Sequence, residues 1–268
     1  MKLSEVKREK RVLVLGAGGV GKTHLVGTLC EIIPTLVVTA DPNGLETIAS
    51  VMRLDPEVIL IEDWRKCYDY YSLIAKEASS GKYKAIALDD FGSAQESLRH
   101  KLEQMPRGKS EEYAARTGKE FEKQVKRELL LGERRLHIDQ WGSMWIGLET
   151  FLGDVLSLPF DVKLVTVLEG EAENPRDGLD HIYPNLQGAI RYSISARFGL
   201  VAEAFIASVD GTTEYALTCR SHPKIETKSR YGDGRTWVNP TMLDVLAYIA
   251  GKSTGESDVE KKIGVGIR

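Results

Sequence analysis

The sequence contains few cysteines and no long apolar run. Its three cysteines, Cys30, Cys67 and Cys219, are widely separated, and no pair has the spacing of metal ligands. This pattern argues against a disulfide framework and predicts a reduced, cytoplasmic protein. No apolar run approaches about 18 residues, so we expect no membrane-spanning helix and no membrane partner. The charged residues 1–11 also lack the apolar segment of a secretory signal.

A strong net charge is missing as well. The chain carries 36 Lys and Arg against 39 Asp and Glu, a formal net charge of −3. This balance gives no overall attraction to nucleic acid, so any such contact must come from a local basic patch. With 268 residues and 42% hydrophobic residues, the chain can bury a full core. No repeat or linker divides it, and we expect one domain over residues 1–250 and a flexible polar tail over 251–268.

Apolar strands alternate with helical segments along most of the chain. The predicted strands cover residues 11–15, 35–41, 57–63, 83–90 and 161–169. The segment from Leu200 to Arg220 reads as two further strands joined at Asp210-Gly211, a hairpin signal. These patterns predict an α/β fold with a mostly parallel central sheet, helices on both faces and a C-terminal β-hairpin.

Three other segments carry more specific structural predictions. The spacing of apolar residues over 138–155 predicts a helix whose buried stripe includes Trp141 and Trp145. Residues 170–185 are polar and predict a long loop. A closing helix should follow Asn239 as its cap, with Pro240 in the first position. Residues 99–135 are densely charged with both signs, which fits either a solvated helical excursion or a mobile basic arm that touches a polyanion.

The stretch "VLVLGAGGVGKTHL" over residues 12–25 matches two phosphate-binding motifs. Gly16, Gly18 and Gly21 form the dinucleotide fingerprint G-x-G-x-x-G, whereas Gly16 and Gly21 with the next two residues form the P-loop G-x-x-x-x-G-K-T. Asp41 supports the dinucleotide interpretation, because it lies 20 residues beyond Gly21, about where a ribose-binding carboxylate is found.

The pair Lys22-Thr23 favours a nucleoside triphosphate. Backbone N–H groups hold the pyrophosphate of a dinucleotide and need no lysine there. A triphosphate carries more charge, so a lysine in the first helical turn binds its β- and γ-phosphates and the hydroxyl of Thr23 binds Mg²⁺. We therefore expect a nucleoside triphosphate and Mg²⁺ as cofactors. The predicted nucleotide-binding residues are Gly16, Ala17, Gly18, Gly19, Val20, Gly21, Lys22, Thr23 and His24.

A carboxylate at the end of another apolar strand agrees with this interpretation. In "AIALDD", residues 85–88 are apolar and Asp89 follows directly, as a Walker-B aspartate would. On its own, Asp89 would be an ordinary strand-end aspartate. Together with the upstream P-loop, it is our second predicted Mg²⁺ ligand.

Two P-loop subclasses are excluded by missing residues. A guanine-specific protein should carry N-K-x-D, but none of the four asparagines is followed by lysine. A partition-type ATPase should begin its loop with lysine after the first glycine, where this chain has Ala17. A small-molecule kinase stays open, because its acceptor site leaves no fixed signature.

The order of the segments resembles the RecA-like ATPases of bacteriophages, nucleotide-binding proteins related to the Sak-type single-strand annealing recombinases. The resemblance runs from about residue 11 to 249. Its segments are residues 16–23, "LVVTADPNG", "IALDD", "DQWGSM", "LSLPFDVKLVTVLEGEAE", "YPNLQGAIRYSI" and "KIETKSR". It implies a RecA-type core, ATP hydrolysis, self-association into a ring or filament, and phage DNA recombination or annealing in the host cytoplasm. The implied partners are single-stranded DNA and, beside it, a single-strand-binding protein or an exonuclease.

The resemblance also implies catalytic roles. RecA-like proteins place a catalytic carboxylate after the strand next to the P-loop strand, and Asp41 is the candidate for orienting the attacking water. Glu46 is a weaker candidate, and Glu169 could assist. Lys228 and Arg230 match basic residues that enter a neighbouring subunit's ATP site, although a solvated basic turn is an equal interpretation.

DNA contact would fall on residues 99–135 and 170–191, which carry lysines and arginines. Two further classes stay open. One is a P-loop switch or loader that recruits a protein partner with little hydrolysis, and the other is the dinucleotide oxidoreductase.

Overall fold

The computed structural model describes residues 9–63, 67–105, 125, 128, 136, 138–174 and 177–252. Its strands are β1 Lys10–Gly16, β2 Thr35–Thr39, β3 Val58–Leu60, β4 Ala85–Leu88, β5 Val162–Glu173, β6 Asp180–Pro184, β7 Leu200–Val209, β8 Thr212–Thr218, β9 Lys228–Ser229 and β10 Thr236–Val238. Its helices are α1 Lys22–Ile32, α2 Gly44–Glu46, η2 Thr47–Val51, α3 Cys67–Ser80, α4 Phe91–Glu103, α7 Ile138–Ser157, α8 Ile190–Ser193, η4 Ile194–Arg197 and α9 Met242–Ile249.

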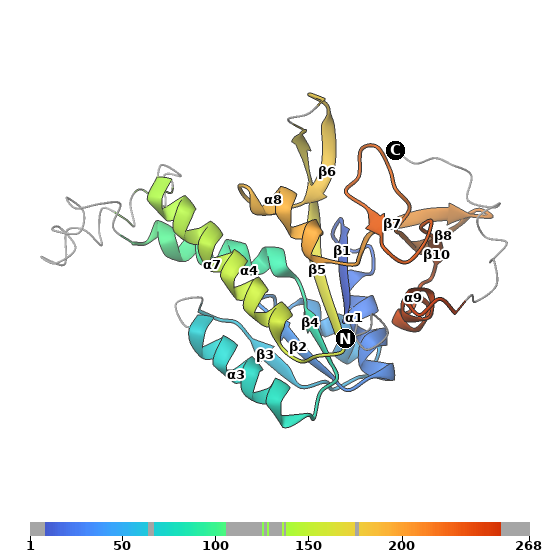
Figure 1. Cartoon of the computed structure of the whole chain (residues 1–268), viewed down its shortest axis with the longest axis horizontal. Helices are drawn as coiled ribbons and strands as arrows, with labels where there is room; N and C mark the ends of the chain where they lie inside the picture. The colour runs from blue at the N-terminus through green and yellow to red at the C-terminus, as the bar shows by residue number, and fades with distance from the viewer. Residues whose placement is uncertain are drawn as a thin grey trace, which may run out of the picture.

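One mixed sheet organises these elements (Figure 1). Its strand order is β10-β8-β7-β1-β5-β4-β2-β3. The six strands from β7 to β3 pair in parallel, whereas β8 and β10 continue the sheet antiparallel. The predicted α/β class, the mostly parallel sheet and the hairpin of β7 and β8 are therefore confirmed.

Alternating residues of the strands build a core on each face of the sheet. Leu13 and Leu15 of β1 pack into a cluster with α3, α4 and α7. Val12 and Val14 face the other way and pack with α1 and α9. Helices cover both faces because the central strands are mostly apolar on both sides. Among the described residues, no helix is long and apolar enough to cross a membrane.

The prediction that Trp141 and Trp145 are core residues of α7 is wrong. Each is 37% exposed. The buried stripe runs instead through Met144, Leu148 and Phe151, with Leu152 and Val155 beside it. At 100° per residue, positions 141 and 145 both fall on the Leu152 side of that stripe, and position 141 also lies in the first turn of the helix, so both indoles lie at its border with solvent.

Two further predictions need correction. Within the predicted loop 170–185, two segments form a hairpin instead, because β5 continues to Glu173 and pairs antiparallel with β6. The N-cap of α9 is Thr241 rather than Asn239, and its hydroxyl accepts a hydrogen bond from the backbone N–H of Asp244 in a capping box. Of the charged segment 99–135, residues up to Glu103 continue α4, and most of the remainder lies outside the described residues.

Candidate nucleotide-binding site

The P-loop joins the end of β1 to the start of α1. Gly21 has φ 89° and Gly19 has φ 78°, left-handed values that favour glycine. A Cβ on Gly16 would lie 2.3 Å from the carbonyl oxygen of Ala204 on β7, so the close packing of β1 against β7 requires glycine. The loop thus opens at the N-terminus of an 11-residue helix, whose first backbone N–H groups and dipole favour a bound phosphate.

Lys22 occupies the mouth of this loop. Its side chain is 8% exposed, and its Nζ donates hydrogen bonds of 2.7 Å to the carbonyl of Gly16 and 2.6 Å to that of Ala17. Burial lowers the pKa of the ammonium, and the charges of Asp90, Asp89 and Glu169 oppose this effect. A positive charge is therefore held between the loop and three carboxylates.

Asp89 lies at the end of β4 and is 3% exposed. Burial raises the pKa of its carboxyl, and hydrogen bonds from the hydroxyls of Thr166 and Thr23 act in the opposite direction. Thr23 is the first residue after the P-loop lysine. The fold therefore brings together the two residues that the sequence predicts as Mg²⁺ ligands.

The space in front of Gly44 tests whether these residues suit a metal ion. A Cβ on Gly44 would lie 3.7 Å from Oδ2 of Asp41, 3.7 Å from Oδ2 of Asp89 and 3.8 Å from Oγ1 of Thr23. Three oxygen atoms from three separate segments thus lie within 4 Å of one point. Mg²⁺ prefers oxygen ligands and takes few from the protein when phosphates and water complete its shell. The donor set fits this ion.

The strand order changes the expectation about Asp41. It follows β2, which is separated from β1 by β5 and β4, so β2 is not the strand next to the P-loop strand. Asp41 reaches the site through the turn that precedes α2, where its Oδ1 accepts a 2.9 Å hydrogen bond from the backbone N–H of Asn43. Glu46, the weaker candidate, is exposed and accepts a hydrogen bond from Ser50.

The strands that do flank β1 carry two glutamates near the loop. Glu169 on β5 follows Leu168, which pairs with Gly16. Glu203 on β7 pairs with Leu15. Burial, and then the charge of Glu169, raises the pKa of Glu203 to about 7. The sequence analysis missed Glu203, because only the strand order places it beside the P-loop.

Two other residues of the site were also missed. Asp90, the second aspartate of "LDD", caps α4 and accepts hydrogen bonds of 3.0 Å from the N–H of Gly92 and 3.2 Å from Oγ of Ser93. Thr166 is fully buried on β5 and donates to Asp89. The doubled aspartate was a visible signal, whereas no motif marks Thr166.

Lys228 and Arg230 do not lie beside the P-loop but farther back along β7. Lys228 on β9 pairs with Val201, three residues before Ala204, which contacts Gly16. Arg230 is exposed and donates a 3.2 Å hydrogen bond to the carbonyl of Ala196. Lys228 thus lies about 10 Å back along β7 from the P-loop, and Arg230, whose backbone N–H donates to the carbonyl of Gly199, lies about 16 Å back.

Comparison with known proteins assigns the family. A family of AAA domains (AAA_24) matches residues 8–231. The chain belongs to this family. It is a P-loop ATPase of the AAA/RecA-like type, and this class replaces the dinucleotide interpretation of the loop. No curated protein sequence matches the chain.

Two solved structures are similar to this AAA domain. One is a KaiC-like protein of the hyperthermophilic archaeon Pyrococcus horikoshii OT3, with 14% identity, a TM-score of 0.38, and coverage of 86% of this chain and 89% of that chain. The other is a prototypical ATPase from the type III secretion system of pathogenic bacteria, with 12% identity, a TM-score of 0.43, and coverage of 73% and 52% respectively.

Proposed function

We propose that this AAA domain hydrolyses ATP with Mg²⁺ and acts as an oligomer on single-stranded DNA in phage recombination or annealing. The observation that supports hydrolysis is that side-chain oxygens of Thr23, Asp89 and Asp41 lie close to one point beside Gly44, next to the P-loop. The resemblance to phage RecA-like ATPases supports the DNA-related role.

Each residue of this site has a proposed role. Lys22 exchanges its two carbonyl partners for the β- and γ-phosphates. Thr23 and Asp89 hold Mg²⁺, which when bound offsets the charge of the phosphates. Asp41 accepts a proton from the attacking water or orients it, and Glu169 is a candidate to assist. The backbone N–H groups of residues 18–23 hold the phosphate oxygens.

Lys228 and Arg230 are proposed to act between subunits. Both residues lie back along β7, away from the P-loop of their own chain. Residues that act on the ATP site of a neighbouring subunit are expected to lie away from their own. A cation in that position would offset charge that develops on the γ-phosphate.

A protein partner is the second candidate, and two observations favour it. The hairpin of β5 and β6 projects from the sheet (Figure 1) and carries Glu171, Glu173 and Asp180, which repel a polynucleotide backbone. On α7, Trp141, Trp145 and Ile146 are 37%, 37% and 58% exposed. Aromatic side chains of this kind are enriched where proteins bind proteins. An ATP-dependent switch or loader would use such a surface.

ATP turnover measured with and without single-stranded DNA separates the two candidates. We expect Mg²⁺-dependent turnover that single-stranded DNA stimulates and duplex DNA of the same sequence does not. Slow turnover that DNA leaves unchanged, with no binding of DNA in the ATP-bound form, would remove the recombination role and favour the switch. Absence of turnover and of ATP binding would reject the ATPase site itself.

A further inference from the structure

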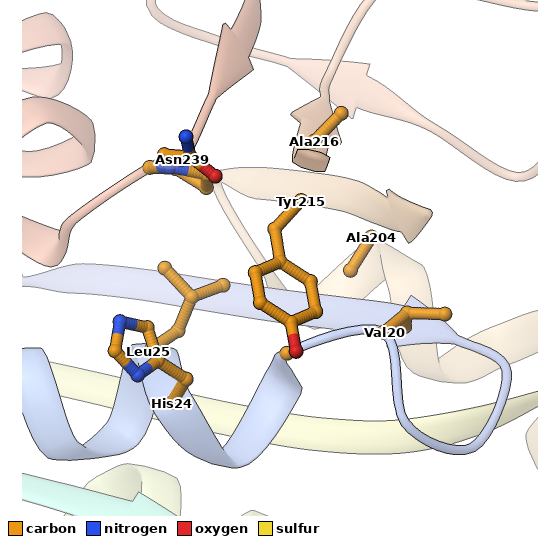
Figure 2. Close-up of a pocket in the computed structure, with 9 residues that line it drawn as sticks. Val20, His24, Leu25, Ala204, Tyr215, Ala216 and Asn239 are labelled. Atoms are coloured by element: carbon orange, nitrogen blue, oxygen red, sulfur yellow. The ribbon is translucent and has the colours of Figure 1, made fainter. Parts of the chain in front are cut away.

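A cavity of about 160 Å³ opens directly beside the P-loop. Its walls come from the first turn of α1, from β7 and β8, and from the segment between β10 and α9 (Figure 2). Val20, Gly21 and His24 belong both to this wall and to the predicted phosphate-binding segment. A ligand whose phosphates lie on the loop therefore has its remaining part within reach of the cavity.

Tyr215 of β8 forms the aromatic wall of the cavity. Its ring lies against the end of the P-loop, since a Cβ on Gly21 would be 3.1 Å from Cδ1 of Tyr215. The side chain is 45% exposed, so part of the ring is open to a ligand. The ring of His24 lies nearly parallel, with an interplanar angle of 17° and centroids 6.5 Å apart. Flat aromatic surfaces of this kind bind other planar rings by stacking.

The size of the cavity suits a planar ring system. An apolar cavity of about 150 Å³ holds a single benzene ring. This cavity is slightly larger, at about 160 Å³, and is partly lined by Val20, Leu25 and Pro240. It therefore has room for one apolar-faced ring directly beside the P-loop, which contributes Val20 and Gly21 to its wall.

Asn239 supplies the polar group of the cavity, and its orientation is fixed. Its Nδ2 donates a 2.7 Å hydrogen bond to Oε2 of Glu214, and its backbone N–H donates a 2.7 Å hydrogen bond to the carbonyl of Tyr215. Since an ionised carboxylate only accepts hydrogen bonds, Glu214 selects the amide NH₂. The amide oxygen is left on the side of Tyr215 (Figure 2).

An amide oxygen in that position discriminates between bases. It accepts a hydrogen bond from an exocyclic amino group, such as N6 of adenine. The carbonyl oxygen O6 that guanine carries at the same place is another acceptor, so the two oxygens would repel each other.

We propose that this cavity is the base-binding subsite of the nucleotide, in which Tyr215 stacks on the base and Asn239 accepts a hydrogen bond from its amino group. This inference rests on the proposed function, because it assumes that the P-loop holds the phosphates. It adds the residues that select the base, which no motif in the sequence marks.

The test compares the binding of ATP, GTP and inorganic tripolyphosphate, each with Mg²⁺, by calorimetry. Tyr215→Ala should weaken ATP about tenfold and leave tripolyphosphate unchanged, because only the base loses its partner. Tyr215→Phe keeps the ring and should bind ATP like the wild type. Asn239→Gly tolerates the φ of 47° at this position and should reduce the preference for ATP over GTP. Tyr68→Ala, a change at an 80% exposed tyrosine of α3, is the matched control.

The outcomes separate this inference from the proposed function. Unchanged tripolyphosphate binding shows that each variant keeps a folded P-loop. If Tyr215→Ala and Asn239→Gly then bind ATP and GTP as the wild type does, the base lies elsewhere and the inference is overturned while the ATPase stands. If the wild type binds neither ATP nor tripolyphosphate, the proposed function is rejected and the inference with it.

Discussion

The ammonium of Lys22 donates a 2.7 Å hydrogen bond to the carbonyl of Gly16, the first residue of its own phosphate-binding motif. A second hydrogen bond, of 2.6 Å, goes to the carbonyl of Ala17. The lysine thus spans the loop from its last residues to its first. A triphosphate offers the same ammonium charged oxygens, which are stronger acceptors than neutral carbonyls. Nucleotide binding should therefore move this side chain without disturbing β1 or α1.

Replacement of Lys22 by alanine should abolish ATP hydrolysis and leave the fold intact. The variant loses the charge that holds the β- and γ-phosphates, whereas the carbonyl of the exposed Ala17 can bind water instead. Turnover and the thermal unfolding midpoint should be measured on the same sample. Retained turnover in a folded variant would count against the whole assignment of the site.

Asp41→Asn and Asp90→Asn should differ in turnover. Oδ2 of Asp41 lies close to the same point beside Gly44 as Oδ2 of Asp89 and Oγ1 of Thr23, so loss of its charge should lower kcat about 10²- to 10⁴-fold, with little change in ATP affinity. Asp90 caps α4, and asparagine caps helices nearly as well as aspartate. Asp90→Asn is therefore the matched control and should keep most of the stability and turnover. The reverse result would move the water-orienting role to Asp90.

Mixed assemblies test whether Arg230 acts on a neighbouring subunit. A Lys22→Ala subunit lacks a working loop but keeps its Arg230, and an Arg230→Ala subunit has the opposite defect. Arg230 lies back along β7 from the P-loop of its own chain, so we propose that it acts on the neighbour's loop. Mixing both inactive variants should then pair an intact loop with an intact Arg230 and restore part of the turnover. Turnover that stays at the sum of the separate variants would reject the action between subunits.

The fold could be predicted because its signals are local. Apolar strands such as residues 11–15, alternating with helical segments, are enough to indicate a parallel sheet covered on both faces. The errors came from features that depend on packing. The stripe of α7 passes through Met144 rather than Trp145, a rotation that periodicity alone does not resolve. The hairpin of β5 and β6 carries Glu171, Glu173 and Asp180, so residues 170–185 have the composition of a loop.

The residues of the site also fall into two groups, those that local sequence predicts and those that only the fold brings to the P-loop. Lys22 and Thr23 lie within one motif, and Asp89 directly follows an apolar strand, so sequence spacing alone was enough to find them. Glu203 and Tyr215 come from β7 and β8, about 180 and 190 residues after Lys22 in the chain, and reach the loop only because β7 pairs with β1. No local pattern distinguishes them from ordinary residues of a hairpin.

Glu203 should make the stability of the protein depend on pH in a defined window. Burial, and then the charge of Glu169, raises its pKa from 4.5 to about 7. Below pH 4.5 the carboxyl is protonated in both the folded and the unfolded chain, so it does not lower the free energy of unfolding. Between pH 4.5 and 7 the unfolded chain releases the proton that the folded protein retains, so the free energy of unfolding falls as the pH rises. Above pH 7 the carboxyl is ionised in both states, and the free energy of unfolding stays at its lowered value.

Urea unfolding at pH 5 and pH 8 measures this effect when the wild type is compared with Glu203→Gln. The amide has no charge to bury. The free energy of unfolding of the variant, relative to that of the wild type, should therefore be higher at pH 8 than at pH 5 by roughly 1–2 kcal/mol, a figure that allows for partial exposure of the side chain. Other titrating groups are shared by both proteins and largely cancel in the difference. Glu169→Gln should shrink the effect without removing it, because burial is the larger of the two causes. A difference between wild type and Glu203→Gln that is the same at both pH values would mean that Glu203 titrates near its ordinary pKa and is well solvated beside the P-loop.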